Sequence, residues 1–329
     1  MRTGKKAVVY GGGNIGRGFL GQLLYESGYE TVFVDIDRRL IDELNRQGGY
    51  PIRIVSNEEV KEIRVENVRA VTPEDAPAEI AEADILFTSA GVPILPKIAP
   101  VIRAGLDLRK TGVDIIICEN LIGADDYLRG LVGAQENVGF VEASVGRMVP
   151  VMTDAMREGD ITRVWVEPYC TLPVDRAAFR NPIPEIRGMI PSEPFAYYIQ
   201  SKLYLHNMGH AVAAYMGMQK GIEYIWQAME DKEIRETVAA AMKASALALS
   251  LEHGKPLSEV EAYAEDLQRR FCNRYLGDTT KRVGRDTKRK LAPDDRLLGA
   301  LALCQKHGIA ADAVKKGIMA ALDYLWEND

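Results

Sequence analysis

The feature that most constrains this chain is an apolar run that meets a cluster of glycines near the N-terminus. Residues 7–10 read A-V-V-Y and residues 11–16 read G-G-G-N-I-G, which fits the pattern G-x-G-x-x-G. A helical pattern follows over about residues 14–27, and a second apolar run, residues 31–34, leads into Asp35. A strand, a glycine turn, a helix and a second strand that ends in an acid together predict a unit that binds a dinucleotide.

Each glycine of this pattern has its own physical reason. Gly11 permits the tight turn, Gly13 has no Cβ where a pyrophosphate approaches the backbone, and Gly16 lets the helix pack on the strand. The phosphates are expected at the positive N-terminus of the helix. The residues expected to hold the cofactor at this loop are Gly11, Gly13, Asn14, Ile15 and Gly16.

The acid at the end of the second strand indicates which dinucleotide binds. Asp35 would accept hydrogen bonds from the ribose hydroxyl groups and would repel a 2′-phosphate, so NAD is favoured over NADP. Arg38 and Arg39 follow closely, and they leave the strictness of this preference open.

Composition and charge exclude several other classes of protein. The 329 residues allow two domains with cores of their own, with 47% hydrophobic and 27% charged residues. A net charge of -6 argues against a partner such as nucleic acid or an anionic membrane. No apolar run approaches the length of a membrane span or of a signal-peptide core, so we expect a cytoplasmic location.

Cysteine and histidine are sparse and scattered. The four cysteines show no C-x-x-C spacing, and we expect them to be reduced and mostly buried. The four histidines show no H-E-x-x-H pattern and join no ligand cluster with cysteine. We therefore expect no metal, so that a side chain must polarise any reacting oxygen.

The pattern of apolar runs predicts the fold class. Strand-like runs alternate with helical segments over the first half, which predicts an α/β, Rossmann-type, doubly wound and mostly parallel sheet. Residues 51–71 alternate and suggest a short added strand pair, whereas four prolines in residues 181–194 disfavour a regular element there. The pattern beyond is helical. We therefore predict a nucleotide-binding domain over 1–190 and an all-α C-terminal domain over 191–329.

Two segments lie where the parallel strands are expected to end. Ser89 and Ala90 follow the run at 84–88 and offer small side chains where a cofactor would lie close. Asn120 follows the run at 113–118 and offers a carboxamide for the cofactor or the substrate. A helix N-cap is an equally good interpretation of Asn120.

A second constellation opens the helical half. Treated as an α-helix, residues 202–210 place Lys202, His210 and Asn207 on one broad face, near roughly 0°, 80° and 140°. Lys202 has the chemistry of a general base if burial lowers its pKa, and Asn207 and His210 would donate hydrogen bonds to a developing alkoxide. His206 competes for the role of His210, and an ordinary polar helix face is the alternative.

A basic run, K-R-V-G-R-D-T-K-R-K at residues 281–290, comes later. Cations in such a run can hold a phosphate or a carboxylate, although most of them are expected to be solvated.

These motifs resemble those of the long-chain polyol dehydrogenases, a family that includes the mannitol dehydrogenases. The resemblance covers nearly the whole chain. Its most specific element is the K-x4-N-x2-H signature, here Lys202, Asn207 and His210. Further matches are the opening G-G-G-N-I-G-R-G-F, the C-E-N at 118–120 and the R-V-G-R-D at 282–286.

The resemblance implies a role for each matching position. Lys202 would be the general base, and Asn207, His210 and Asn120 would bind and polarise the reacting oxygen and its neighbours. Arg282 and Lys290 would contact distal oxygens of the substrate. The implied fold is a Rossmann domain followed by a helical domain, and the implied chemistry uses NAD and no metal.

The chain departs from the family pattern at two places. Gly146 stands where the family has an active-site acid, and Leu172 stands where a tryptophan is usual. Both changes are expected to alter the substrate pocket rather than the cofactor site. Whether Glu142 compensates for the missing acid is left open.

The resulting functional prediction is an NAD-dependent oxidoreductase that interconverts a secondary alcohol and a ketone. The expected substrate is a sugar alcohol or sugar phosphate, with a polyol phosphate such as mannitol 1-phosphate first. The alternatives are a dehydrogenase of an aldonic or hexuronic acid, such as altronate or mannonate, and an NAD-binding sensor that has lost turnover. The sequence leaves the substrate and the oligomeric state open.

Overall fold

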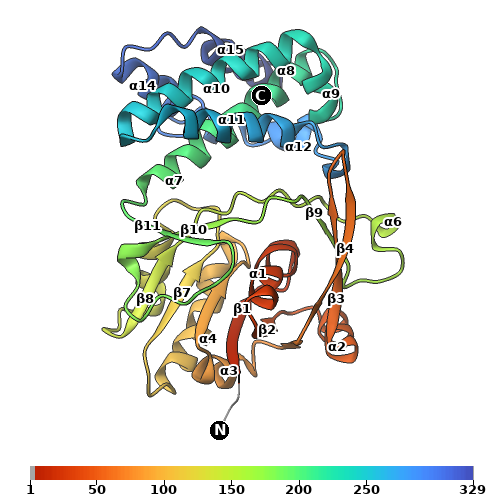
Figure 1. Cartoon of the computed structure of the whole chain (residues 1–329), viewed down its shortest axis with the longest axis vertical. Helices are drawn as coiled ribbons and strands as arrows, with labels where there is room; N and C mark the ends of the chain where they lie inside the picture. The colour runs from red at the N-terminus through yellow and green to blue at the C-terminus, as the bar shows by residue number, and fades with distance from the viewer. Residues whose placement is uncertain (1–3, 329) are drawn as a thin grey trace. The chain divides into compact units, whose positions relative to one another are not determined.

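The computed structural model describes residues 4–328, which form two compact units. The first unit holds residues up to Val55 and Glu59–Phe195. The second holds Ser56–Glu58 and the residues from Ala196 onward. The change of unit thus falls five residues after the domain boundary placed at 190/191 by the prolines. Figure 1 shows the elements of each unit.

A six-stranded sheet forms the centre of the first unit, in the order β5-β2-β1-β6-β7-β8, and every neighbouring pair is parallel. The predicted doubly wound, mostly parallel sheet is therefore confirmed. Its strands in chain order are β1 (Lys5–Tyr10), β2 (Tyr29–Val34), β5 (Val68–Val71), β6 (Ile85–Thr88), β7 (Val113–Ile117) and β8 (Val138–Glu142).

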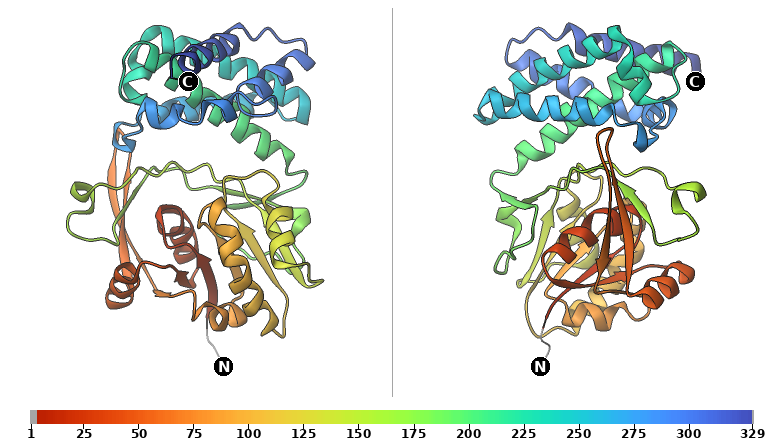
Figure 2. Two further views of the ribbon diagram at one scale, coloured as in Figure 1. Left: turned by 180° about the vertical axis from the view of Figure 1, so that it is seen from behind. Right: turned by 45° about the vertical axis from the view of Figure 1, so that its right-hand side comes forward.

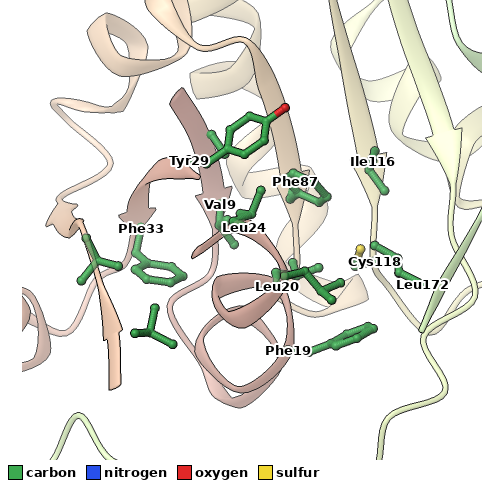
Figure 3. Packing of buried hydrophobic residues seen from close by; sticks show 14 of the residues in the cluster. Val9, Phe19, Leu20, Leu24, Tyr29, Phe33, Phe87, Ile116, Cys118 and Leu172 are labelled. Carbon is green, nitrogen blue, oxygen red and sulfur yellow. The ribbon is translucent and has the colours of Figure 1, made fainter. Parts of the chain in front are cut away.

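Helices cover this sheet because its strands are apolar on both faces. Successive residues of one strand, such as Val8 and Val9, belong to separate buried clusters on opposite faces. The helices of this unit are α1 (Gly21–Glu26), α2 (Arg38–Gln47), α3 (Ala76–Glu82), α4 (Leu95–Asp107), α5 (Ala124–Val132) and α6 (Asp154–Arg157). Figure 3 shows Phe19 and Leu20 packed near Phe87 and Cys118.

The helix that follows the glycines has the predicted extent, but its geometry is not uniform. Residues 14–26 are helical, close to the expected 14–27, and within them Gly16–Leu20 forms a π-helical turn that leads into α1. All five residues of this turn are buried.

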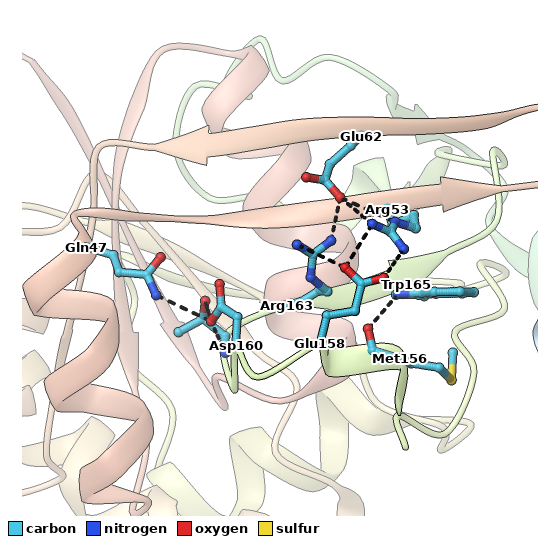
Figure 4. A network of polar contacts seen from close by, with 9 residues as sticks. Gln47, Arg53, Glu62, Met156, Glu158, Asp160, Arg163 and Trp165 are labelled. Carbon is cyan, nitrogen blue, oxygen red and sulfur yellow. Dashed lines mark hydrogen bonds and ion pairs between the residues drawn. The ribbon is translucent and has the colours of Figure 1, made fainter. Parts of the chain in front are cut away.

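Two smaller sheets complete the first unit. β3 (Gly49–Val55) and β4 (Val60–Glu66) form the antiparallel pair expected in residues 51–71, and β9 (Val164–Val166) joins β3 in parallel. Arginines and glutamates link this sheet to the segment before β9, with Arg53 bound to Glu62 and Glu158 (Figure 4). The run at 68–71 was not predicted as a strand of the main sheet.

The proline-rich segment also contains a strand that was not expected. β10 (Leu172–Asp175) and β11 (Met189–Ser192) pair in parallel, and Pro191 lies within β11. A proline is tolerated there because a two-stranded sheet consists only of edges.

The second unit is helical, as predicted. The long α10 packs against α7, α8, α9, α11, α14 and α15 and thus forms the centre of this unit (Figures 1 and 2). Its helices are α7 (Ala196–Ser201), α8 (Met208–Gln219), α9 (Ile225–Glu230), α10 (Lys232–His253), α11 (Leu257–Phe271), α12 (Thr280–Gly284), α13 (Thr287–Lys290), α14 (Leu298–Lys306) and α15 (Asp312–Asn328). Within residues 4–328 no helix combines the length and the apolar character that crossing a membrane requires.

Candidate active site

The glycine loop of the first unit is closed on one side and open on the other. Gly11 has φ +104°, and a Cβ there would lie 2.6 Å from the Ser89 carbonyl oxygen. A Cβ on Gly16 would overlap the carbonyl oxygen of Gly11. A Cβ on Gly13 would meet nothing within 4 Å, because this side of the loop faces open space. Tight packing at two glycines and an open approach at the third are what a pyrophosphate-binding turn requires.

Asp35 closes the loop from the end of β2. Its Oδ2 accepts a hydrogen bond from the Gly12 amide at 2.9 Å, and its Oδ1 accepts from the amides of Ile36 and Asp37 at 2.8 and 3.0 Å. The carboxylate is thus fixed beside the loop, half-buried, and retains lone pairs that can accept further hydrogen bonds. The side chains of Arg38 and Arg39 are exposed beyond it.

Glu119 orders the loop after β6, a role that the sequence analysis missed. Its two carboxylate oxygens accept hydrogen bonds from the amides of Ala90 and Gly91, both at 2.9 Å. Burial raises the pKa of Glu119, and these two amide donors act in the opposite direction. Ser89 donates its hydroxyl to the Gly11 carbonyl at 3.0 Å. The loop at 89–91 is therefore tied both to the glycine loop and to the end of β7.

Asn120 lies exposed in the loop after β7. The N-cap interpretation of this residue is not supported, since α5 begins at Ala124 and its N-cap is Gly123. Glu142, at the end of β8, accepts a hydrogen bond from the Gly123 amide at 2.8 Å. This carboxylate orders the same loop, a contact that gives Glu142 a structural role of its own.

The two departures from the family pattern lie in different surroundings. Gly146 is buried, and a Cβ there would come within 3.3 Å of the Tyr169 ring. Leu172 is fully buried in the core with Phe19 and Ile116 (Figure 3). The expectation that Leu172 alters a substrate pocket is therefore wrong, because its side chain fills the interior.

The first helices of the second unit contain a second π-helical turn, Lys202–Asn207, between α7 and α8. The Met208 amide donates to the Leu203 carbonyl, five residues back. The α-helical geometry assumed from the sequence, with Lys202 and Asn207 roughly 140° apart, is therefore wrong. Hydrogen bonds that span five residues instead stack positions five apart, and such turns are frequent at functional sites.

The residues of this segment differ in how far they are buried. Lys202, Asn207 and His210 are half-buried, whereas Leu203, Leu205 and His206 are buried. His206 was expected to compete with His210, but it is 6% exposed and its Nδ1 has no hydrogen-bond partner among the described residues. Burial lowers the pKa of His206 well below its ordinary value.

His210 is held from two sides. Its ring stacks on Phe271 with centroids 4.9 Å apart and planes 8° from parallel, and its Nε2 lies 3.6 Å from Asp278 Oδ2. Burial, followed by the charges of Arg282 and other cations, lowers the pKa of His210 to about 3. The imidazole is therefore neutral at physiological pH and carries both a donor and an acceptor.

The basic run divides into exposed and buried residues. Most of it is exposed, as expected, but Arg282 is half-buried and Lys290 is only 4% exposed. Arg282 forms an ion pair with Asp278, the acid beside His210, which no sequence motif had indicated. Burial, then the charges of Arg296 and Arg289, lowers the pKa of Lys290 to about 8. This unit thus gathers His210, Arg282 and Lys290 in one electrostatic environment.

The part of the chain that the structure describes contains neither a cluster of metal ligands nor a disulfide. No three histidine, cysteine, aspartate or glutamate side chains are grouped as a metal ion requires. The four cysteines are free thiols.

Comparison with known proteins identifies the family. The description "Mannitol dehydrogenase Rossmann domain" matches residues 5–188, and "Mannitol dehydrogenase C-terminal domain" matches residues 195–329. The chain belongs to the mannitol dehydrogenase family. Mannitol-1-phosphate 5-dehydrogenases from Brevibacillus brevis and Bacillus pumilus are each 36% identical to it over 340 aligned residues. These alignments cover 98% of this chain and 87% and 89% of the two relatives.

Two solved dehydrogenase structures share the fold of this chain. Mannitol 2-dehydrogenase from Pseudomonas fluorescens, a ternary complex with NAD and D-mannitol, superposes with a TM-score of 0.75 at 17% identity, covering 98% of this chain and 79% of that one. A substrate-free D-sorbitol dehydrogenase gives a TM-score of 0.84 at 16% identity, covering 98% and 81%. At these identities the likeness concerns the fold alone.

Proposed function

We propose that this chain is an NAD-dependent dehydrogenase that oxidises a secondary hydroxyl group of a sugar alcohol phosphate, with mannitol 1-phosphate as the first substrate to test. The observation that carries the proposal is that the signature residues Lys202, Asn207 and His210 are all half-buried and that two cations of the basic run act on His210 through their charges. The 36% identity to mannitol-1-phosphate 5-dehydrogenases supports the phosphorylated substrate.

The proposed cofactor is NAD, which when bound accepts the hydride that leaves the substrate carbon. The open side of Gly13 and the helix start at Asn14, Ile15 and Gly16 would take its pyrophosphate. Asp35 would accept hydrogen bonds from the ribose hydroxyls, which disfavours the extra phosphate of NADP. Ser89 and Ala90 would lie against the cofactor, in the loop that Glu119 orders.

Lys202 is the proposed general base. Oxidation of an alcohol needs a group that removes the hydroxyl proton, and a neutral amine can do so near neutral pH if its surroundings favour the uncharged form. With this base in place no metal ion is required to activate the hydroxyl group.

Asn207 and His210 are the proposed ligands of the reacting oxygen, and Asn120 of the first unit is proposed to bind the cofactor or the substrate. A neutral imidazole donates a hydrogen bond to a developing alkoxide without adding a full charge, and the low pKa of His210 keeps it neutral across the working pH range. The stacked Phe271 ring fixes the imidazole plane, which reduces the reorganisation that the reaction requires.

Arg282 and Lys290 are the proposed ligands of the substrate anion. Lys290 is buried and Arg282 is half-buried, and a cation that is shielded from water interacts with an anion more strongly than an exposed one does. The exposed cations of the same run, Lys281 among them, are screened by solvent.

The test is NADH formation by the purified chain with mannitol 1-phosphate, mannitol, altronate and mannonate, each with NAD and with NADP. We expect turnover with mannitol 1-phosphate and NAD, and little with unphosphorylated mannitol. Lys202→Ala should lose at least a hundredfold in kcat and keep its affinity for NADH, and small primary amines should restore part of the rate. Lys281→Ala, which removes an exposed lysine of the second unit, is the matched control and should retain turnover.

A second candidate function is oxidation of an aldonic or hexuronic acid, which the same two cations favour because they fit a carboxylate as well as a phosphate. Faster turnover of altronate or mannonate than of mannitol 1-phosphate would establish this candidate instead. NADH binding without turnover of any of the four substrates would identify a sensor that has lost catalysis, and unchanged activity of Lys202→Ala would refute the assigned base.

A further inference from the structure

We infer that Arg17 is a positioning residue for the dinucleotide: from beneath the glycine loop it turns the Gly12–Gly13 peptide outward and places a positive charge under the pyrophosphate. This inference rests on the proposed function, because it names a residue that acts on the same cofactor. Arg17 lies in the first π-helical turn and is 5% exposed, so its side chain acts from within the fold.

The orientation of the Gly12–Gly13 peptide group is the first observation that supports this role of Arg17. The Arg17 guanidinium donates through Nη1 to the carbonyl oxygen of Gly12. In a trans peptide the carbonyl and the following N–H point in opposite directions. Holding the Gly12 carbonyl inward therefore turns the Gly13 amide outward, toward the side where a Cβ on Gly13 would meet nothing within 4 Å.

The neighbouring groups of the loop already have partners. Gly11 donates its amide to the Val34 carbonyl at 2.9 Å and accepts the Ser89 hydroxyl, while the Gly12 amide donates to Asp35. The Gly13 amide has no acceptor within residues 4–328. A fixed loop with one outward amide is preorganised to meet an anion.

The guanidinium is itself held by a rigid support. Its Nε donates to the Thr162 carbonyl at 3.2 Å, and Thr162 is fully buried. Asp160 fixes that residue by accepting from its amide at 2.9 Å and its hydroxyl at 2.6 Å. Asp160 also accepts from Gln47, beside the ion-pair network on β3 and β4 (Figure 4). The buried Tyr50 hydroxyl donates to the main-chain carbonyl of Arg17 at 2.7 Å.

The charge of Arg17 carries the second step. Both of its side-chain hydrogen bonds go to carbonyl oxygens, and the carboxylates of Asp35 and Asp160 act on it only through their charges. Burial lowers the pKa of Arg17 from its ordinary value, yet a guanidinium stays protonated in proteins. A buried cation that is hydrogen-bonded to no carboxylate is costly, and the negative charge of a bound pyrophosphate offsets the part of that cost that Asp35 and Asp160 leave.

The experiment compares ligands that share the adenosine part and differ in the pyrophosphate. Binding of NADH, ADP and adenosine is measured for the wild-type chain, Arg17→Met and Arg17→Lys. Adenosine binding is measured by its ability to displace NADH. We expect Arg17→Met to bind NADH and ADP at least tenfold more weakly and adenosine within twofold of wild type. Arg17→Lys keeps a charge but loses the planar guanidinium, so its affinity for NADH and ADP should lie between those of the wild-type chain and Arg17→Met.

Arg147→Met is the matched control. Arg147 is equally buried and also donates to main-chain carbonyls, those of Gly18 and Glu167, neither of which belongs to the glycine loop. Any effect of this variant should be the same for all three ligands, as expected of a structural role alone.

The outcomes separate the inference from the proposed function. Equal weakening of NADH, ADP and adenosine in the Arg17 variants, or no weakening at all, would overturn the role of Arg17. If Arg17→Met does not fold, the same comparison with Arg17→Lys decides. A wild-type chain that binds no NADH would refute the proposed function and, with it, the inference.

Discussion

At the scale of single residues, the burial of Lys290 predicts a pH dependence of anion binding. The pKa of Lys290 is lowered to about 8, chiefly by burial, so the amine loses its charge as the pH rises through that value. Below pH 8 it is a cation and can hold a phosphate, whereas above pH 8 it becomes neutral. The inhibition constant of inorganic phosphate should therefore rise roughly tenfold between pH 7.5 and pH 9.

The measurement is competitive inhibition by phosphate against the sugar alcohol phosphate, at fixed ionic strength across this pH range. Lys290→Arg keeps its charge throughout and should give a nearly constant inhibition constant. A constant value for the wild-type chain would show that the Lys290 charge plays no part in holding the anion.

At the scale of elements, the loops that follow the parallel strands depend on buried carboxylates. Glu119 accepts from two amides, those of Ala90 and Gly91. Glu119→Gln replaces one acceptor oxygen by an NH2 group and leaves one amide unsatisfied. The free energy of unfolding should fall by about 1–3 kcal/mol, and NADH should bind more weakly because the loop at 89–91 loses its order.

Glu142→Gln is the control for that change. Glu142 also accepts from two amides, those of Gly123 and Ala124, but it orders a different loop. NADH titration should show the larger loss of affinity in Glu119→Gln, because the loop at 89–91 is hydrogen-bonded to the glycine loop. Equal losses of affinity would mean that the order of the loop at 89–91 has no specific effect on NADH binding.

The elements also show where the sequence is informative. Apolar runs predicted five strands of the main sheet, because strands buried on both faces consist of continuous apolar residues. The run at 68–71 was missed because the charged residues before it suggested an edge. Neither π-helical turn was predicted, since hydrophobic periodicity reports the face that is buried and not the span of each hydrogen bond.

The candidate site was predictable only in part, for a related reason. Glycines and signature residues have fixed spacings along the chain, so Gly13, Lys202 and His210 could be named from local patterns. Arg17 stood within the quoted motif, but its role depends on Thr162, which is far away in sequence. Asp278 had no motif at all, and only folding brings it beside His210.

At the scale of the whole molecule, the two units allow the effect of the cofactor to be located. The glycine loop, Asp35 and the loop at 89–91 all belong to the first unit. A ligand that binds only the folded state stabilises it by about 2.7 kcal/mol at a hundred times its dissociation constant. NADH at that concentration should therefore raise the free energy of unfolding of the first unit by this amount.

The three tryptophans make the measurement specific, because Trp165 lies in the first unit and Trp226 and Trp326 lie in the second. A Trp226→Phe/Trp326→Phe double variant leaves Trp165 as the reporter of the first unit in urea unfolding. Its transition should move to higher urea with NADH, while Trp165→Phe reports the second unit. A shift of the transition reported by Trp226 and Trp326 alone would contradict the assignment of the cofactor to the glycine loop, because binding must stabilise the unit that holds the ligand.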